Sequence, residues 1–252
     1  MTSNLVKTFN GLTGYKWDHW TLWVDFVEMM AISLSNAVDI VHAKKREERY
    51  LQIVNKYSKD ELYIFSKMYA DLVIDLEQNP RDVLGEAFME LGLGNKWRGQ
   101  FFTPYPTAYI MAKNTLPADD IQRLVDEKGF VTVGDNACGG GVTLIAAFNW
   151  IREAGFNPQQ MLVLEGGDID VRSCCMSYVQ LSLLGANAVI HERDGLAPQS
   201  EADRDTWFTP FYILGAWKAK QMFGIVANPK VVELPVIESA SGQLGFDVSE
   251  VS

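Results

Sequence analysis

The sequence predicts an α/β fold, with a parallel sheet flanked by helices over residues 96–252 and a helical region over residues 1–95. Three observations support this prediction. Apolar side chains before residue 95 recur at helical spacing of three to four residues. β-Type and helical runs alternate between residues 130 and 193, which is typical of βαβ units. A glycine-rich turn at residues 135–141 joins the first such strand to a helix.

The composition is that of a folded chain with a substantial core. Hydrophobic residues make up 48% of the 252 residues, and no apolar run approaches the roughly 20 residues of a membrane span. The N-terminus lacks the profile of a secretion signal. Three cysteines, two of them adjacent at Cys174 and Cys175, form no disulfide framework. We therefore expect a cytoplasmic protein without a membrane partner, and we expect no bound metal.

The net charge of −10 argues against a free-standing DNA-binding protein, which normally carries a basic surface. A DNA substrate would therefore require a partner chain or a local basic groove. The run Lys44-Lys45-Arg46 is a candidate, although a solvated helix face is the favoured interpretation.

Three helices are predicted in detail before residue 95. The first has a stripe that packs into the core, formed by Trp17, Trp20, Trp23, Val24, Val27, Met30 and Ala31. The second begins at a capping box, Ser58 to Glu61, and runs to about Glu77. The third has Asn79 as its N-cap and Pro80 as its first residue, and it covers Arg81 to Leu91.

The predicted sheet follows two further helices, Tyr105–Leu116 and Ala118–Glu127. Its strands are 130–135, 161–167 and 187–193, and the helices between them are 141–154 and 171–185. Parallel strands end at one edge of a sheet, where ligands usually bind. We therefore expect the acids that end the three strands to meet there, namely Asp135, Asp168 and Asp194.

The turn Asp135-Asn136-Ala137-Cys138-Gly139-Gly140-Gly141 is the most informative feature of the chain. Glycines allow a ligand to approach the backbone, and the following helix offers free N–H groups. The turn carries no lysine and matches no phosphate-binding loop. An acid before the glycines would repel a pyrophosphate and would suit a ligand with a cationic part. The turn therefore points to S-adenosyl-L-methionine (SAM), which carries an ammonium and a sulfonium.

The later strand ends suggest roles for the rest of such a ligand. Asp168 is predicted to accept hydrogen bonds from ribose hydroxyls, while Asp170 is interpreted as the cap of the next helix. For Asp194-Gly195 two interpretations stay open: an acceptor for the adenine amine, or an ordinary turn.

Several motifs together resemble one family. Gly99-Gln100-Phe101-Phe102-Thr103-Pro104 is very similar to a Gly-Gln-Phe-Phe-Thr-Pro loop, and residues 135–141 look like Asp-Pro-Ala-Cys-Gly-Ser-Gly, with Asn136 and Gly140 as departures. Gly167-Asp168-Ile169-Asp170 and Arg193-Asp194-Gly195 look like later motifs of the same group. The stretch from about Asp82 to Gly195 thus resembles the SAM-dependent adenine-N6 DNA methyltransferases, especially the methylation subunits of type I restriction-modification systems.

The resemblance implies a Rossmann-like SAM-binding core and a role for each matching residue. The methionine side of SAM would be lined by Gln100, Phe102, Thr103 and Pro104. Asp135 would meet its amino group, and the turn would contact it through Ala137, Cys138, Gly139 and Gly141. Asp168 would hold the ribose, Ile169 would pack on the adenine, and Asp194 would accept from the adenine amine.

The catalytic Asn-Pro-Pro-aromatic motif of that family has only a partial counterpart. Asn228 and Pro229 are the candidate catalytic residues, but Lys230 and Val231 follow them. The aromatic segment 206–212 lacks the asparagine, and a buried aromatic loop is the favoured interpretation for it. The resemblance implies methyl transfer to adenine N6 in DNA. The alternatives are a catalytically impaired SAM-binding regulatory or assembly subunit, and a methyltransferase for another amine. Protein partners or a homo-oligomer are compatible with each.

Overall fold

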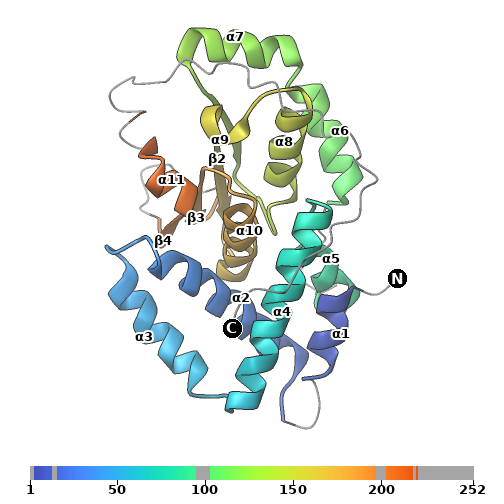
Figure 1. Cartoon of the computed structure of the whole chain (residues 1–252), viewed down its shortest axis with the longest axis vertical. Helices are drawn as coiled ribbons and strands as arrows, with labels where there is room; N and C mark the ends of the chain where they lie inside the picture. Colours follow the sequence, from blue (N-terminus) through green and yellow to red (C-terminus); the bar gives the residue numbers. More distant parts are fainter. Residues whose placement is uncertain (1–2, 13–15, 95–102, 197–202, 218–219, 221–252) are drawn as a thin grey trace, which may run out of the picture.

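The computed structural model describes residues 3–12, 16–94, 103–196, 203–217 and 220, and within them the chain forms an α/β fold (Figure 1). A four-stranded, mostly parallel sheet lies beside a group of N-terminal helices. None of the described helices is long and apolar enough to cross a membrane. The elements are, in chain order, α1 (Asn4–Asn10), α2 (His19–Asn36), α3 (Ala43–Val54), α4 (Lys59–Gln78), α5 (Val83–Glu90), α6 (Tyr105–Thr115), α7 (Ala118–Lys128), β1 (Val131–Asp135), α8 (Val142–Glu153), α9 (Pro158–Met161), β2 (Leu162–Asp168), α10 (Val171–Leu183), β3 (Ala188–Glu192), β4 (Asp205–Phe208) and α11 (Pro210–Leu214).

The sheet has the strand order β1-β2-β3-β4, and its first three strands are parallel. Helices α8 and α10 connect these strands as the alternating pattern predicts. Alternate side chains of β2 point to opposite faces. Leu162 and Leu164 belong to the main core, whereas Val163 packs with Tyr212 and Trp217 on the other face.

The sequence predicts a parallel sheet and a buried aromatic loop at residues 206–212, and strand β4 differs from both predictions. Strand β4 runs antiparallel to β3, and it includes Trp207 from the segment expected to be a buried aromatic loop. Trp207 is indeed buried, but it sits in a paired strand. Threonine and aromatic residues favour strands, and the connection from Glu192 to Asp205 has no helix in its described part, so the chain returns antiparallel.

The described N-terminal residues are helical, as predicted, and their aromatic stripe packs into the core. Trp23 is completely buried, with its ring 5.9 Å from Phe88 between centroids. Helix α2 begins only at His19, after its N-cap Asp18, so Trp17 precedes it. One continuous hydrophobic cluster includes residues of these helices and of the sheet. The proposed boundary at residue 95 stays a prediction.

Helix caps near residue 80 correct one local prediction. The capping box of Ser58 and Glu61 is present at the start of α4, as expected. Asn79, however, is the C-cap of α4, and its N–H donates to Asp75 O. The N-cap of α5 is Asp82, whose carboxylate accepts from the Gly85 N–H at 2.8 Å. A carboxylate three residues before a free N–H is a strong cap, so the helix starts later than predicted.

The basic run at residues 44–46 is not a uniform solvated face. Lys44 and Lys45 are exposed, but Arg46 is buried. Its guanidinium lies 3.8 Å from the Trp207 ring centroid and donates to Asp205 Oδ1 at 3.1 Å. Arg46 therefore joins α3 to strand β4, and its charge is not available to a polyanion.

Candidate functional site

The ends of the three parallel strands are tied together by backbone hydrogen bonds. The Cys138 N–H donates to Gly167 O at 2.9 Å, which joins the glycine turn to the end of β2. The Gly139 N–H donates to the Asp168 carboxylate at 3.0 Å. The Arg193 N–H, just after β3, donates to Asp168 O at 2.9 Å. The glycine turn, Asp168 and the end of β3 thus lie at one carboxyl edge of the sheet.

The turn needs glycines for reasons internal to the protein. Gly139 has a φ of 55° and Gly141 a φ of 95°, a region that favours glycine. A Cβ on Gly141 would lie 2.7 Å from Ser177 Oγ on α10. Gly141 is also buried and is the N-cap of α8. Its glycine identity therefore follows from packing, and a contact between Gly141 and a cofactor stays a prediction.

A buried polar network supports the turn from behind, and sequence reasoning did not identify it. Gln180 Nε2 donates to Gly140 O and to Asp82 Oδ1, each at 2.8 Å. Gln180 Oε1 accepts from the Leu84 N–H at 3.0 Å. Burial raises the pKa of the Asp82 carboxyl above its usual value. The one signal in the sequence that could have indicated this network is a glutamine between two apolar residues, Val179 and Leu181.

The two carboxylates that end β1 and β2 accept hydrogen bonds from uncharged donors. Asp135 accepts from the Ala137 N–H at 2.9 Å through one oxygen and from the Thr143 hydroxyl through the other. Asp168 accepts from the Asp170 N–H at 2.9 Å, besides Gly139. Within the described residues no Lys, Arg or His nitrogen lies within 4.0 Å of either carboxylate. Desolvation accordingly raises the pKa of Asp168.

Asp170 and Asp194 have local roles in the structure. Asp170 is the N-cap of α10, as predicted, and it binds the Arg172 guanidinium at 2.6 Å. Asp194 is exposed and accepts from the Leu196 N–H at 2.9 Å, which is the geometry of an Asp turn. Its second oxygen has no partner among the described residues, so a contact with the adenine amine stays a prediction. Ile169, between the two acids of its motif, is 54% exposed.

The remaining predicted residues are placed unequally. Thr103 and Pro104 are exposed at the start of α6, where Pro104 is the N-cap. Cys138 is buried, and burial raises the pKa of its thiol to about 12, so it stays a protonated packing group. Gln100, Phe102, Asn228 and Pro229 lie outside the described residues.

The carboxylates of this edge can accept hydrogen bonds from hydroxyl and ammonium groups. The edge also holds one cation, the Arg193 guanidinium, which donates to Asn136 Oδ1 of the glycine turn at 2.7 Å. Comparison of the chain with protein-family models, with curated proteins and with solved structures found no match. Any function assigned to this chain therefore depends on the chemistry of the residues at this edge.

Proposed function

We propose that the chain binds SAM at the carboxyl edge of the sheet and transfers its methyl group to adenine N6 in DNA. One observation carries this proposal. The Asp168 carboxylate at the end of β2 touches the glycine turn after β1, with a 3.0 Å hydrogen bond from the Gly139 N–H. A ligand resting on the turn would therefore meet that carboxylate.

The oxygens of this edge have spare capacity for such a ligand. Each carboxylate oxygen has two lone pairs, and each oxygen of Asp168 accepts one protein hydrogen bond. The remaining lone pairs suit two ribose hydroxyls. The exposed Ile169 offers an apolar surface to an adenine ring. Asp135, without a cation beside it, suits the ammonium of SAM.

The transfer step is proposed from the family resemblance. Bound SAM supplies a methyl group activated by its sulfonium. The chain must hold a flipped adenine next to it, with the exocyclic amine donating to the Asn228 side chain and to the Pro229 carbonyl. Because the net charge is −10, DNA would be bound through a partner chain or a local basic groove.

A second candidate function is a SAM-binding regulatory or assembly subunit that transfers nothing. One observation favours it: Lys230 and Val231 stand where the family has a proline and the aromatic ring. Without that ring, a flipped base has no stacking surface at this position. The cofactor residues serve this function equally well.

Cofactor binding is tested by titration calorimetry of the full chain. SAM and S-adenosylhomocysteine should each bind at one site per chain. ATP should bind more weakly, since its triphosphate would meet the carboxylates of Asp135 and Asp168, neither of which pairs with a described cation. No heat with SAM for well-folded protein, or equal affinity for ATP, would refute the proposed site.

Methyl transfer is tested separately with labelled SAM and unmethylated duplex DNA. The first function predicts label in adenine N6, lost in Asn228→Ala with SAM affinity unchanged. Activity that survives in Asn228→Ala would remove Asn228 from the catalytic role. Tight SAM binding without label in any DNA would instead support the regulatory or assembly function.

A further inference from the structure

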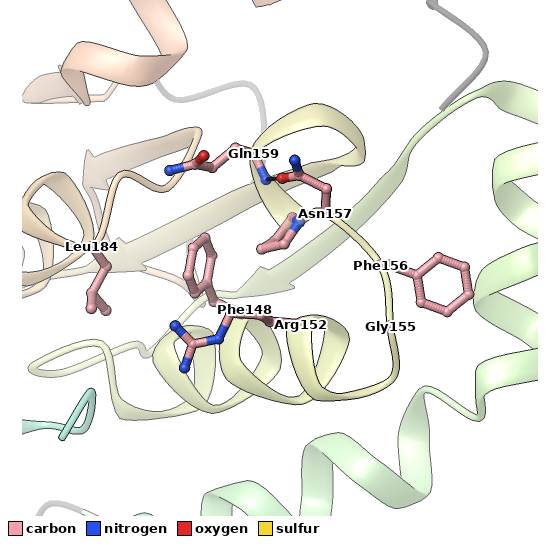
Figure 2. A pocket seen from close by; sticks show the side chains of 8 residues that line it. Phe148, Arg152, Gly155, Phe156, Asn157, Gln159 and Leu184 are labelled. Carbon is pink, nitrogen blue, oxygen red and sulfur yellow. Dashed lines mark hydrogen bonds between the residues drawn. The ribbon is translucent and has the colours of Figure 1, made fainter. Parts of the chain in front are cut away.

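A cavity lies at the edge of the sheet opposite the carboxyl edge, where the strands begin. It has a volume of about 220 Å³ and lies between the end of α8, the loop before α9 and the end of α10 (Figure 2). Five residues decide its chemistry, namely Phe148, Arg152, Pro158, Gln159 and Leu184. None of them belongs to the carboxyl edge, so the cavity is independent of the proposed SAM site.

Part of the wall of the cavity is apolar and well supported. Phe148 and Pro158 are buried, and Leu184 is half-buried. Figure 2 shows the Phe148 ring between the Gln159 amide and the Arg152 side chain in that view, whereas Phe156 points to the other side. An apolar cavity of about 150 Å³ is enough for benzene. The volume here therefore accommodates a planar ring with one small substituent.

Arg152 gives the cavity a positive charge that the protein leaves uncompensated. Its guanidinium is exposed, and its one side-chain partner in the described part of the chain is Asn149 Oδ1 at a long 3.4 Å. Most other described arginines lie within 4.0 Å of a carboxylate, namely Arg46, Arg49, Arg81, Arg123, Arg172 and Arg204. The chain has a net charge of −10, yet this arginine at the rim of the cavity has no acid partner among the described residues. Such an arginine favours an anionic ligand.

Gln159 lines the cavity, and its backbone is held in place by two hydrogen bonds. Its backbone is held in α9 by the Asn157 cap, which accepts from the Gln159 N–H at 3.0 Å, and by Asn187 Nδ2, which donates to Gln159 O at 2.8 Å. A Cβ on Gly185 would lie 2.6 Å from Gln159 Nε2. Glycine at position 185 therefore leaves room for this amide at the cavity.

We propose that this cavity binds a small monocarboxylate that carries a planar apolar group, of the size of benzoate. The ring packs against Phe148, Pro158 and Leu184. The carboxylate accepts two parallel hydrogen bonds from the planar Arg152 guanidinium, an arrangement that carboxylates and arginine favour. The Gln159 side chain borders the ligand's ring on the side away from Arg152 and forms no hydrogen bond with the carboxylate.

Benzoate, benzyl alcohol and inorganic phosphate are the probes, each titrated into the full-length protein by NMR. In the wild-type protein, benzoate should shift the amide resonances of Arg152, Gln159 and Leu184 and leave Asp135 and Asp168 unchanged. Benzyl alcohol, which has the ring without the charge, should bind about tenfold more weakly, and so should phosphate, which has charge without a ring; tenfold corresponds to about 1.4 kcal/mol.

The matched variants are Arg152→Gln and, as a control, Arg123→Gln on α7. Arg152→Gln should weaken benzoate binding at least tenfold, because both charge-assisted hydrogen bonds from the guanidinium are lost, and Arg123→Gln should leave it unchanged. Equal weakening in both variants, phosphate binding as tight as benzoate, or shifts at the carboxyl edge would each overturn the proposal. Displacement of benzoate by SAM would do the same, because it would assign the anion to the cofactor site. The wild-type shift map decides the matter even if Arg152→Gln fails to fold.

Discussion

A buried acid of the helical region has different hydrogen-bond partners from the acids at the carboxyl edge of the sheet. Asp25 on α2 is buried and accepts from Lys56 Nζ at 2.9 Å and from the Tyr57 hydroxyl at 2.6 Å. Asp135 and Asp168 accept from backbone N–H groups and a threonine hydroxyl instead. Asp25 is thus paired with a cation of its own region, whereas Asp135 and Asp168 are not.

The pKa values of Glu61 in the helical region and Asp168 at the edge are shifted in opposite directions. Hydrogen bonds from the Ser58 N–H, Trp17 and Lys16 lower the pKa of Glu61 from 4.5 to about 2. Desolvation raises the pKa of Asp168 from 3.8. Hydrogen bonds, the strongest from uncharged donors, thus favour the charged form of Glu61, whereas burial disfavours that of Asp168, which would gain stabilisation when a cationic or hydroxyl-bearing ligand arrives.

The largest effect is expected where two acids share one buried cation. Arg46→Met should lower the free energy of unfolding by about 3–5 kcal/mol, because Asp39 and Asp205 lose their guanidinium in a buried setting. Arg49→Met, on the same helix, breaks the more exposed pair with Glu28 and should cost about 1 kcal/mol or less. Urea unfolding measures both, and equal losses would contradict the distinction between the two pairs.

A smaller effect is expected on ligand binding at the edge. Asp168→Asn should weaken SAM binding by about 1–3 kcal/mol, the cost of losing hydrogen bonds to a charged acceptor. Glu165→Gln is the matched control, since Glu165 is an exposed acid of the same strand and should leave the affinity unchanged. Calorimetry measures both affinities. An unchanged affinity in Asp168→Asn would remove Asp168 from the ribose role.

The smallest effect is a difference in pH dependence. Glu61 has a lowered pKa, so its contribution is present above pH 4.5 and is lost as pH falls through about 2. Asp168 has a raised pKa, so its contribution is present below pH 3.8 and is lost as pH rises through the raised value. The free energy of unfolding of the wild type minus that of Glu61→Gln should therefore fall as the pH is lowered. The same difference for Asp168→Asn should fall as the pH is raised. Urea unfolding from acid to neutral pH measures it, and slopes of the same sign would be contrary evidence.

Local patterns predicted local structure well in both regions. The capping box at Ser58 and the three parallel strands depend on residues close together in the chain, and each lies where it was expected. The cap at Asp82 was misplaced because Asn79-Pro80 and Asp82 are both good helix-start signals. Strand β4 was missed, because residues 206–212 were expected to form a buried aromatic loop and strand propensity does not specify a pairing partner.

Local sequence patterns predict the order of strands and helices up to β3, and hence the edge at which Asp135 and Asp168 emerge. The packing of the helices against the sheet selects the polar groups that are used internally. Gln180 lies 98 residues from Asp82, and Arg46 lies 159 residues from Asp205, yet each pair is hydrogen-bonded. Periodicity and caps act over three or four residues, so they determine local conformation. Contacts between distant polar groups depend on how the helices pack against the sheet, which no local pattern encodes.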